Sequence, residues 1–136
     1  MHDRAALIAL LERVIRAKGY DRELDVAILI ALGQCVDERR GKDKKSWLYQ
    51  PNGNRWDTAW HGYNAAPRLT ASIDAVVALI ERVLPGWSWT IRPRHCVMRH
   101  PIAPMHDTEA GAATTALAMC AAILKALIAQ EAEHEG

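Results

Sequence analysis

The sequence lacks the features that mark exported, membrane-spanning or disulfide-rich proteins. Its 136 residues include only three cysteines, which are far apart and form no Cys-x-x-Cys pair, so neither a disulfide framework nor a zinc ribbon is expected. No eighteen apolar residues run together as a membrane span requires, and residues 1–14 mix charged with apolar positions, unlike a cleavable signal peptide. These absences predict a cytosolic protein without a membrane partner, with reduced thiols at Cys35, Cys96 and Cys120.

The chain also lacks an excess of charge of either sign. Its 17 Lys and Arg residues stand against 16 Asp and Glu residues, and the formal net charge is +1. This balance falls short of the strongly basic character of a typical nucleic-acid-binding domain. The most basic short run, ERRGKDKK at residues 38–45, is interrupted by Glu38 and Asp43, and such runs are typical of a solvated loop. Nucleic acid is therefore not an expected partner.

Motifs of the common enzyme classes are absent as well. No Gly-x-Ser-x-Gly, His-Glu-x-x-His, P-loop or zinc-deaminase pattern occurs, and serine occurs only three times. Asp74 and Glu81 are seven residues apart, which places them on one face of a helix with roughly 10 Å between them along its axis. Surface carboxylates are the commoner meaning of such a pair. We therefore expect no catalytic residue and no cofactor.

One stretch without acidic side chains, PGWSWTIRPRHCVMRHPIAPMH at residues 85–106, concentrates histidine, cysteine, arginine and tryptophan. Its His95, Cys96, His100 and His106 are of the types that zinc accepts as ligands. Neighbouring residues of a strand point to opposite faces, however, so His95 and Cys96 cannot meet one ion, and His95 and His100 also differ in parity. We therefore expect no metal site here and interpret these residues as ordinary strand and loop positions.

Four segments have the spacing of apolar residues that is typical of helices. The expected N-cap and end of the first three are, in order, Asp3 and Gly19, Asp21 and Gly33, and Thr70 and Pro85-Gly86. The fourth helix follows a loop over residues 101–111. It has one apolar face and ends in a solvated glutamate tail.

Two hairpins are expected between these helices. Asn52-Gly53 separates two aromatic segments and predicts a hairpin with strands near 46–50 and 55–60. Residues 87–92 alternate apolar with polar side chains, which predicts a strand with its two tryptophans on the core face. After a turn, residues 95–100 form the partner of this strand. Both hairpins indicate antiparallel pairing.

The resulting order, α-α-β-β-α-β-β-α, predicts an α+β protein: a layered α/β/α sandwich with a small antiparallel sheet covered by helices. The length suits one domain, so residues 1–136 are expected to fold as a unit.

Three segments resemble the phage ABA sandwich domain family, which comprises small proteins encoded in phages and prophages. The segments are RELDVAILIALG at 22–33, LTASIDAVVALIERVLPGWSW at 69–89 and ATTALAMCAAILKAL at 113–127. The resemblance implies a layered α/β/α fold and a phage or prophage protein in the cytoplasm of a bacterial host. It transfers no catalytic residue.

The remaining candidate site combines aromatic and arginine side chains, a combination that stacks a base and clamps a phosphate. We expect the aromatic middle segment to adjoin the arginines of the second hairpin. The predicted binding residues are Trp47, Tyr49, Arg55, Trp56, Trp60, Arg92, Arg94 and Arg99. Two functions fit. One is an accessory protein that binds a host defence protein or a small anionic ligand of the nucleotide type. The alternative is a homo-oligomeric phage assembly protein with the aromatic segment at its interface.

Overall fold

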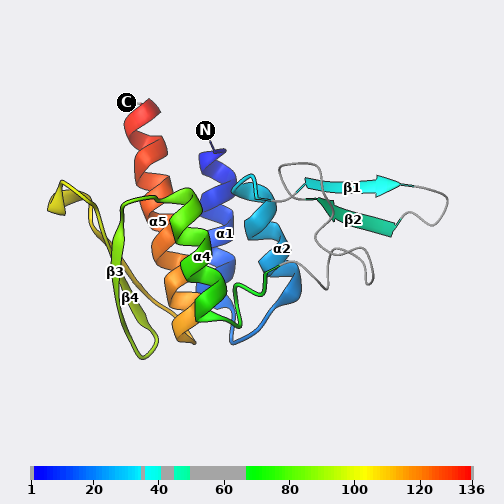
Figure 1. Ribbon diagram of the computed structural model, residues 1–136, viewed down its shortest axis with the longest axis horizontal. Helices are drawn as coiled ribbons and strands as arrows, with labels where there is room; N and C mark the ends of the chain where they lie inside the picture. The colour runs from blue at the N-terminus through cyan, green and yellow to red at the C-terminus, as the bar shows by residue number, and fades with distance from the viewer. Residues whose placement is uncertain (1, 35, 41–44, 50–66, 136) are drawn as a thin grey trace.

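The computed structural model describes residues 2–34, 36–40, 45–49 and 67–135, which form four α-helices and two small antiparallel sheets (Figure 1). The helices are α1 (Arg4–Arg16), α2 (Arg22–Ala31), α4 (Ile73–Val83) and α5 (Thr115–Glu135). The strands are β1 (Val36–Arg40), β2 (Lys45–Tyr49), β3 (Ser88–Arg92), β4 (His95–Arg99) and β5 (Thr108–Gly111), and a short 3-10 helix, η1 (Pro104–His106), precedes β5. This architecture confirms the predicted α+β class, with a small antiparallel sheet packed against helices.

Helix α5 is the central element of the domain. It packs against α1 and α4 and against strands β4 and β5 (Figure 1). Every residue from 116 to 124 is buried, and the alanines among them allow neighbouring elements to approach closely. The predicted apolar face is buried, although burial extends beyond it, and the predicted solvated tail is wrong at Glu131. Even Glu131 is buried, and its Oε1 accepts a hydrogen bond from the backbone N–H of His2 at 3.0 Å.

Over Thr115–Glu133, helix α5 is long and apolar enough to cross a membrane by length and composition alone. However, 67% of this segment is buried inside the domain, which is how the core helix of a soluble protein is placed. The described residues thus form a small α+β domain in which this long helix is covered by the other elements.

The three-stranded sheet has the order β3-β4-β5. Strands β3 and β4 form the predicted hairpin, with Ser88 opposite Arg99 and Arg92 opposite His95. Strand β5 was not predicted: it lies within the expected loop over 101–111 and pairs with the second edge of β4. That pairing satisfies backbone groups of β4 that would otherwise need other partners, which explains why so short a segment is extended. Side chains on the inner face pack toward α5, whereas β3 leaves most of its side chains exposed.

Strands β1 and β2 form a separate sheet at the far end of the molecule, beyond α2 (Figure 1). Strand β2 confirms the strand expected near 46–50, but its partner is β1, with Glu38 opposite Trp47. The solvated loop expected over 38–45 is therefore wrong at residues 38–40, which belong to β1. The other expected strand, 55–60, lies outside the described residues.

Helix N-caps follow the sequence prediction at two of three positions. The side chains of Asp3 and Asp21 accept hydrogen bonds from backbone N–H groups in the first turns of α1 and α2. The prediction for α4 is wrong, because Ser72 and not Thr70 is its N-cap, accepting from the N–H of Ala75 at 3.2 Å.

Thr70 instead belongs to a buried polar cluster that joins α2 to the chain before α4. The Thr70 hydroxyl accepts a hydrogen bond from the N–H of Asp21 at 2.8 Å, and the Thr70 N–H donates to Asp25 Oδ1 at 2.6 Å. Arg22 approaches the other carboxylate oxygen of Asp25 at 3.3 Å. Burial raises the pKa of Asp25 above its ordinary 3.8, although these hydrogen bonds and the nearby guanidinium oppose the shift.

Candidate functional site

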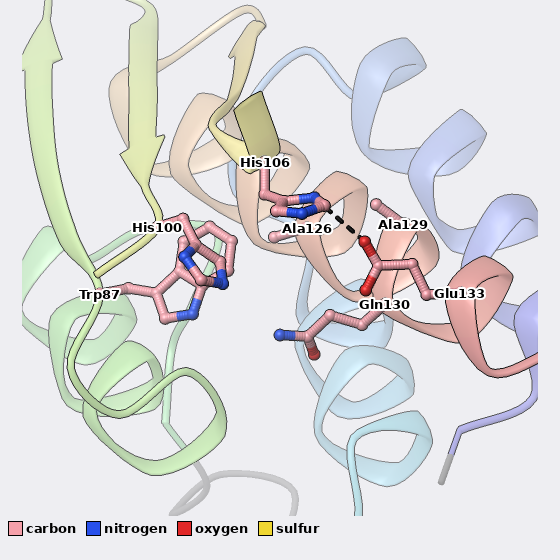
Figure 2. A pocket seen from close by; sticks show the side chains of 7 residues that line it. All are labelled: Trp87, His100, His106, Ala126, Ala129, Gln130 and Glu133. Carbon is pink, nitrogen blue, oxygen red and sulfur yellow. Dashed lines mark ion pairs between the residues drawn. The ribbon is translucent and has the colours of Figure 1, made fainter. Parts of the chain in front are cut away.

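A pocket opens where the ends of the three-stranded sheet meet the C-terminal half of α5 (Figure 2). Its cavity volume is about 60 Å³, and the wider empty space, which includes open solvent, is about 290 Å³. Aromatic and imidazole rings line one side, and small or polar side chains of α5 line the other (Figure 2). The lining residues are Trp87, His100, His106, Ala126, Ala129, Gln130 and Glu133. The four residues from α5 share one face of the helix because they are spaced three or four positions apart.

An imidazole–carboxylate pair closes one edge of this pocket. His106 Nδ1 lies 3.0 Å from Glu133 Oε1, which joins η1 to the last turns of α5 (Figure 2). Both side chains are partly open to solvent, so the pair adds little to the stability of the fold. Its main effect is geometric, since the ion pair holds the imidazole ring beside the pocket.

His100 forms the back of the pocket and holds the loop that follows it. Its Nδ1 accepts hydrogen bonds from the backbone N–H groups of Ile102, at 3.1 Å, and Ala103, at 2.9 Å. Since Nδ1 acts as an acceptor, the proton of the neutral ring lies on Nε2. The His100 N–H in turn donates to Asp107 Oδ1 at 2.8 Å. The loop from 101 to 106 is thus tied at both ends to the imidazole residue.

The three rings of the pocket form a continuous series. Trp87 and His100 meet edge to face, with ring centroids 5.0 Å apart and an interplanar angle of 69°. His100 and His106 are tilted by 47° with centroids 5.3 Å apart. Trp87 is largely buried, which agrees with its predicted place on the core face, but the edge of its ring also borders the pocket (Figure 2).

The segment from the end of β4 through η1 carries an exposed apolar pair beside the pocket. Ile102 is 86% exposed and Met105 is 85% exposed, the highest values among the large hydrophobic side chains of the described residues. Pro101 and Pro104 restrict the backbone of this loop, and the bonds to His100 hold it further. We refer to Ile102 and Met105 together as the apolar tip. Nothing in the described residues covers it, so its apolar surface remains in contact with water.

The predicted arginines lie on the hairpin of β3 and β4, away from this pocket. Arg92 and Arg99 share the outer, exposed face of the sheet, and Arg99 Nε lies 3.4 Å from Thr90 Oγ1. Arg94 is in the turn, with a positive φ of 59°, and its backbone N–H donates to Thr115 Oγ1 at 3.0 Å. The same face carries a second imidazole–carboxylate pair, with His95 Nε2 3.4 Å from Glu109 Oε2. Neither His95 nor Glu109 lines the pocket beside His106 and Glu133.

Of the expected junction of arginine and aromatic residues, the part within the described residues is not formed. Trp47 and Tyr49 lie on β2, at the opposite end of the molecule from β3 and β4 (Figure 1). The helices lie between the two sheets, so Trp47 and Tyr49 do not adjoin the arginines of β3 and β4 (Figure 1). Arg55, Trp56 and Trp60 lie outside the described residues.

Neighbouring residues of the histidine- and cysteine-rich stretch lie on opposite faces of the sheet, as their alternation predicts. His95 faces solvent, whereas Cys96 is buried against α5, where burial raises the pKa of its thiol to about 11. His100 and His106 come together, which the parity argument did not anticipate because both lie beyond the regular part of β4. Within the part of the chain that the structure describes, no three His, Cys, Asp or Glu side chains are grouped so that they could hold a metal ion.

Comparison with known proteins supplies no assignment. No family model matches the chain, and neither the curated proteins nor the solved structures contain a significant match. The resemblance to the phage ABA sandwich domain therefore stays a prediction from the sequence. The pocket and the apolar tip are the structural features that bear on function.

Proposed function

We propose that this is a small accessory protein of a phage or prophage that acts in the bacterial cytoplasm by binding a host protein, without catalysis. The observation that carries the proposal is the apolar tip, Ile102 and Met105, held in place beside a pocket. Large apolar side chains that are almost fully exposed on a constrained loop favour contact with a partner, since binding removes their surface from water.

Preorganisation supports this proposal. His100 and the two prolines already restrict the loop, so a partner that covers the tip loses less conformational entropy than it would on an unconstrained loop. A nucleotide-type ligand has less support, because the pocket contains the carboxylate of Glu133 and the arginines of β3 and β4 lie elsewhere. The phage setting and the host defence protein as partner come from the sequence resemblance.

Site-specific photo-crosslinking in the bacterial host tests the proposal. A benzophenone amino acid replaces Met105 in one variant and Ile15 in a matched control, because Ile15 is another exposed apolar residue, on α1 and away from the pocket. We expect the Met105 variant to form one dominant crosslinked product with a host protein and the Ile15 variant to form none. The same product from both positions, or none from Met105, would overturn the proposal. A product of two copies of this chain would support the homo-oligomeric assembly protein instead.

A further inference from the structure

We propose that the pocket beside the apolar tip binds an arginine side chain of the partner, flanked by apolar residues that pack on Ile102 and Met105. This inference rests on the proposed function, because it describes how the partner is recognised. It begins from the charge of the pocket. None of the seven lining residues is Lys or Arg, and Glu133 is the single residue among them with an acidic side chain.

The carboxylate of Glu133 has capacity for a further donor. Its Oε1 lies 3.0 Å from His106 Nδ1, and Oε2 forms no ion pair or hydrogen bond with the described residues. When the imidazole is neutral, the pair keeps one negative charge at the edge of the pocket. Gln130 lies one helical turn before Glu133 and extends into the same space, where its side-chain amide supplies an acceptor oxygen as well as a donor nitrogen (Figure 2). Two acceptors from one helix face suit a donor with several N–H groups.

The rings of the pocket suit a planar cation. A guanidinium group stacks on aromatic faces and is attracted to them electrostatically, while its N–H groups donate in its own plane. Trp87, His100 and His106 supply such rings on the side opposite the α5 acceptors (Figure 2). Phosphate would instead meet the carboxylate of Glu133, so the local charge favours a cation over an anion.

The size of the pocket indicates a side chain and not a whole cofactor. Its cavity volume of about 60 Å³ is far below that of ligand pockets, which span roughly 300 to 1,000 Å³. The apolar tip also lies immediately beside it, because His100 both lines the pocket and accepts the hydrogen bonds from Ile102 and Ala103. A partner segment that covers the tip therefore places its neighbouring residue at the pocket.

The experiment is an NMR titration of the full chain with N-acetyl-arginine-N-methylamide, followed at the Trp87 indole N–H and at the backbone amides of 100–106. The matched probe is the citrulline analogue, which is neutral and nearly the same shape. We expect saturable shifts at these positions with the arginine probe and about tenfold weaker binding of the citrulline probe. Equal shifts with both probes, no saturable shifts with arginine, or saturation by inorganic phosphate instead would overturn the proposal.

Two variants test whether the arginine probe binds in the pocket. Glu133→Gln should weaken binding of the arginine probe about tenfold, because it removes the charge and keeps the shape. Glu109→Gln is the control, since Glu109 forms the other exposed imidazole–carboxylate pair on the outer face of the sheet. Equal losses in the two variants would show a general charge effect and contradict the site. The titration needs no host partner, so it can fail while the crosslink at Met105 forms, and the two proposals remain separable.

Discussion

His106 and Glu133 meet at 3.0 Å across the pocket edge, so a turn that follows the sheet is joined to the C-terminal part of the central helix. Together with the bonds from His100 to the loop, this pair places two exposed apolar side chains at one end of a well-packed domain. The arrangement uses polar contacts to hold a hydrophobic surface in position. It separates the residues that support folding from those that we propose contact a partner.

Replacement of Ile80 by aspartate should unfold the domain, because Ile80 is 1% exposed on α4 and the change places an unpaired charge in the core. The expected loss is more than about 4 kcal/mol of the free energy of unfolding, measured by chemical denaturation. Val77→Asp should cost less, since Val77 is only half-buried on the same helix. Equal losses at both positions would show that α4 is oriented differently.

Asp25 should make stability fall as pH rises. Burial raises the pKa of Asp25 above 3.8 in the folded chain, so the unfolded chain releases this proton first as pH increases. The stabilising contribution of the protonated form is therefore full below about 3.8 and is lost as pH rises through the folded pKa. Asp25→Asn should flatten this part of the pH profile, whereas Asp74→Asn, at an exposed position of α4, should leave it unchanged. Identical profiles of the wild type and Asp25→Asn would contradict this account.

The two described thiols should be unreactive in the folded protein. Burial raises the pKa of Cys96 to about 11 and that of Cys120 to about 12, so both are neutral at pH 8. We expect iodoacetamide to modify them slowly in buffer and rapidly in denaturant, where the thiol pKa returns toward 9.0. Their raised pKa values also predict that stability declines as pH rises above about 9, since the unfolded thiols ionise first. Rapid modification of both in buffer would show that this core is open.

Part of this structure could be predicted from the sequence, because those features depend on residues close together in the chain. Asp3 and Asp21 act as N-caps through backbone groups only a few residues away, and the alternation in β3 reflects its own two faces. Strand β5 could not be predicted in this way because its four residues, TEAG, show no clear alternation and are extended through pairing with β4. Similarly, the Asn52-Gly53 signal predicted a local partner for β2, but the pairing that the structure describes is with β1.

The pocket could not be predicted from the sequence, because it depends on contacts between distant segments. His100, His106 and Glu133 come from three separate segments, and only the packing of α5 against the sheet brings them together. The glutamate-rich end of α5 predicts a solvated Glu133, and its side chain is indeed 58% exposed although it borders the pocket. The spacing of 126, 129, 130 and 133 on one helix face was the available signal, but the sequence did not show that η1 covers that face.

Arg92→Ala should leave both folding and partner binding unchanged, in contrast to the expectation from sequence. Arg92 is exposed on the outer face of the sheet and does not line the pocket, so its removal should alter stability by under about 0.5 kcal/mol. Thermal denaturation and the crosslinking yield at Met105 measure the two effects. A loss of crosslinking with an unchanged melting temperature would return the binding site to the arginine-bearing hairpin.

The most direct measurement is the affinity of the crosslinked host partner for the wild type and for a double variant, Ile102→Ser with Met105→Ser. The account predicts that the double variant melts at the same temperature, because both side chains are exposed, and binds at least about 100-fold more weakly. Calorimetry gives the affinity, and Ile15→Ser is the control for loss of an exposed apolar side chain elsewhere. Unchanged affinity of the double variant, with folding intact, would contradict the proposal that the apolar tip binds the partner.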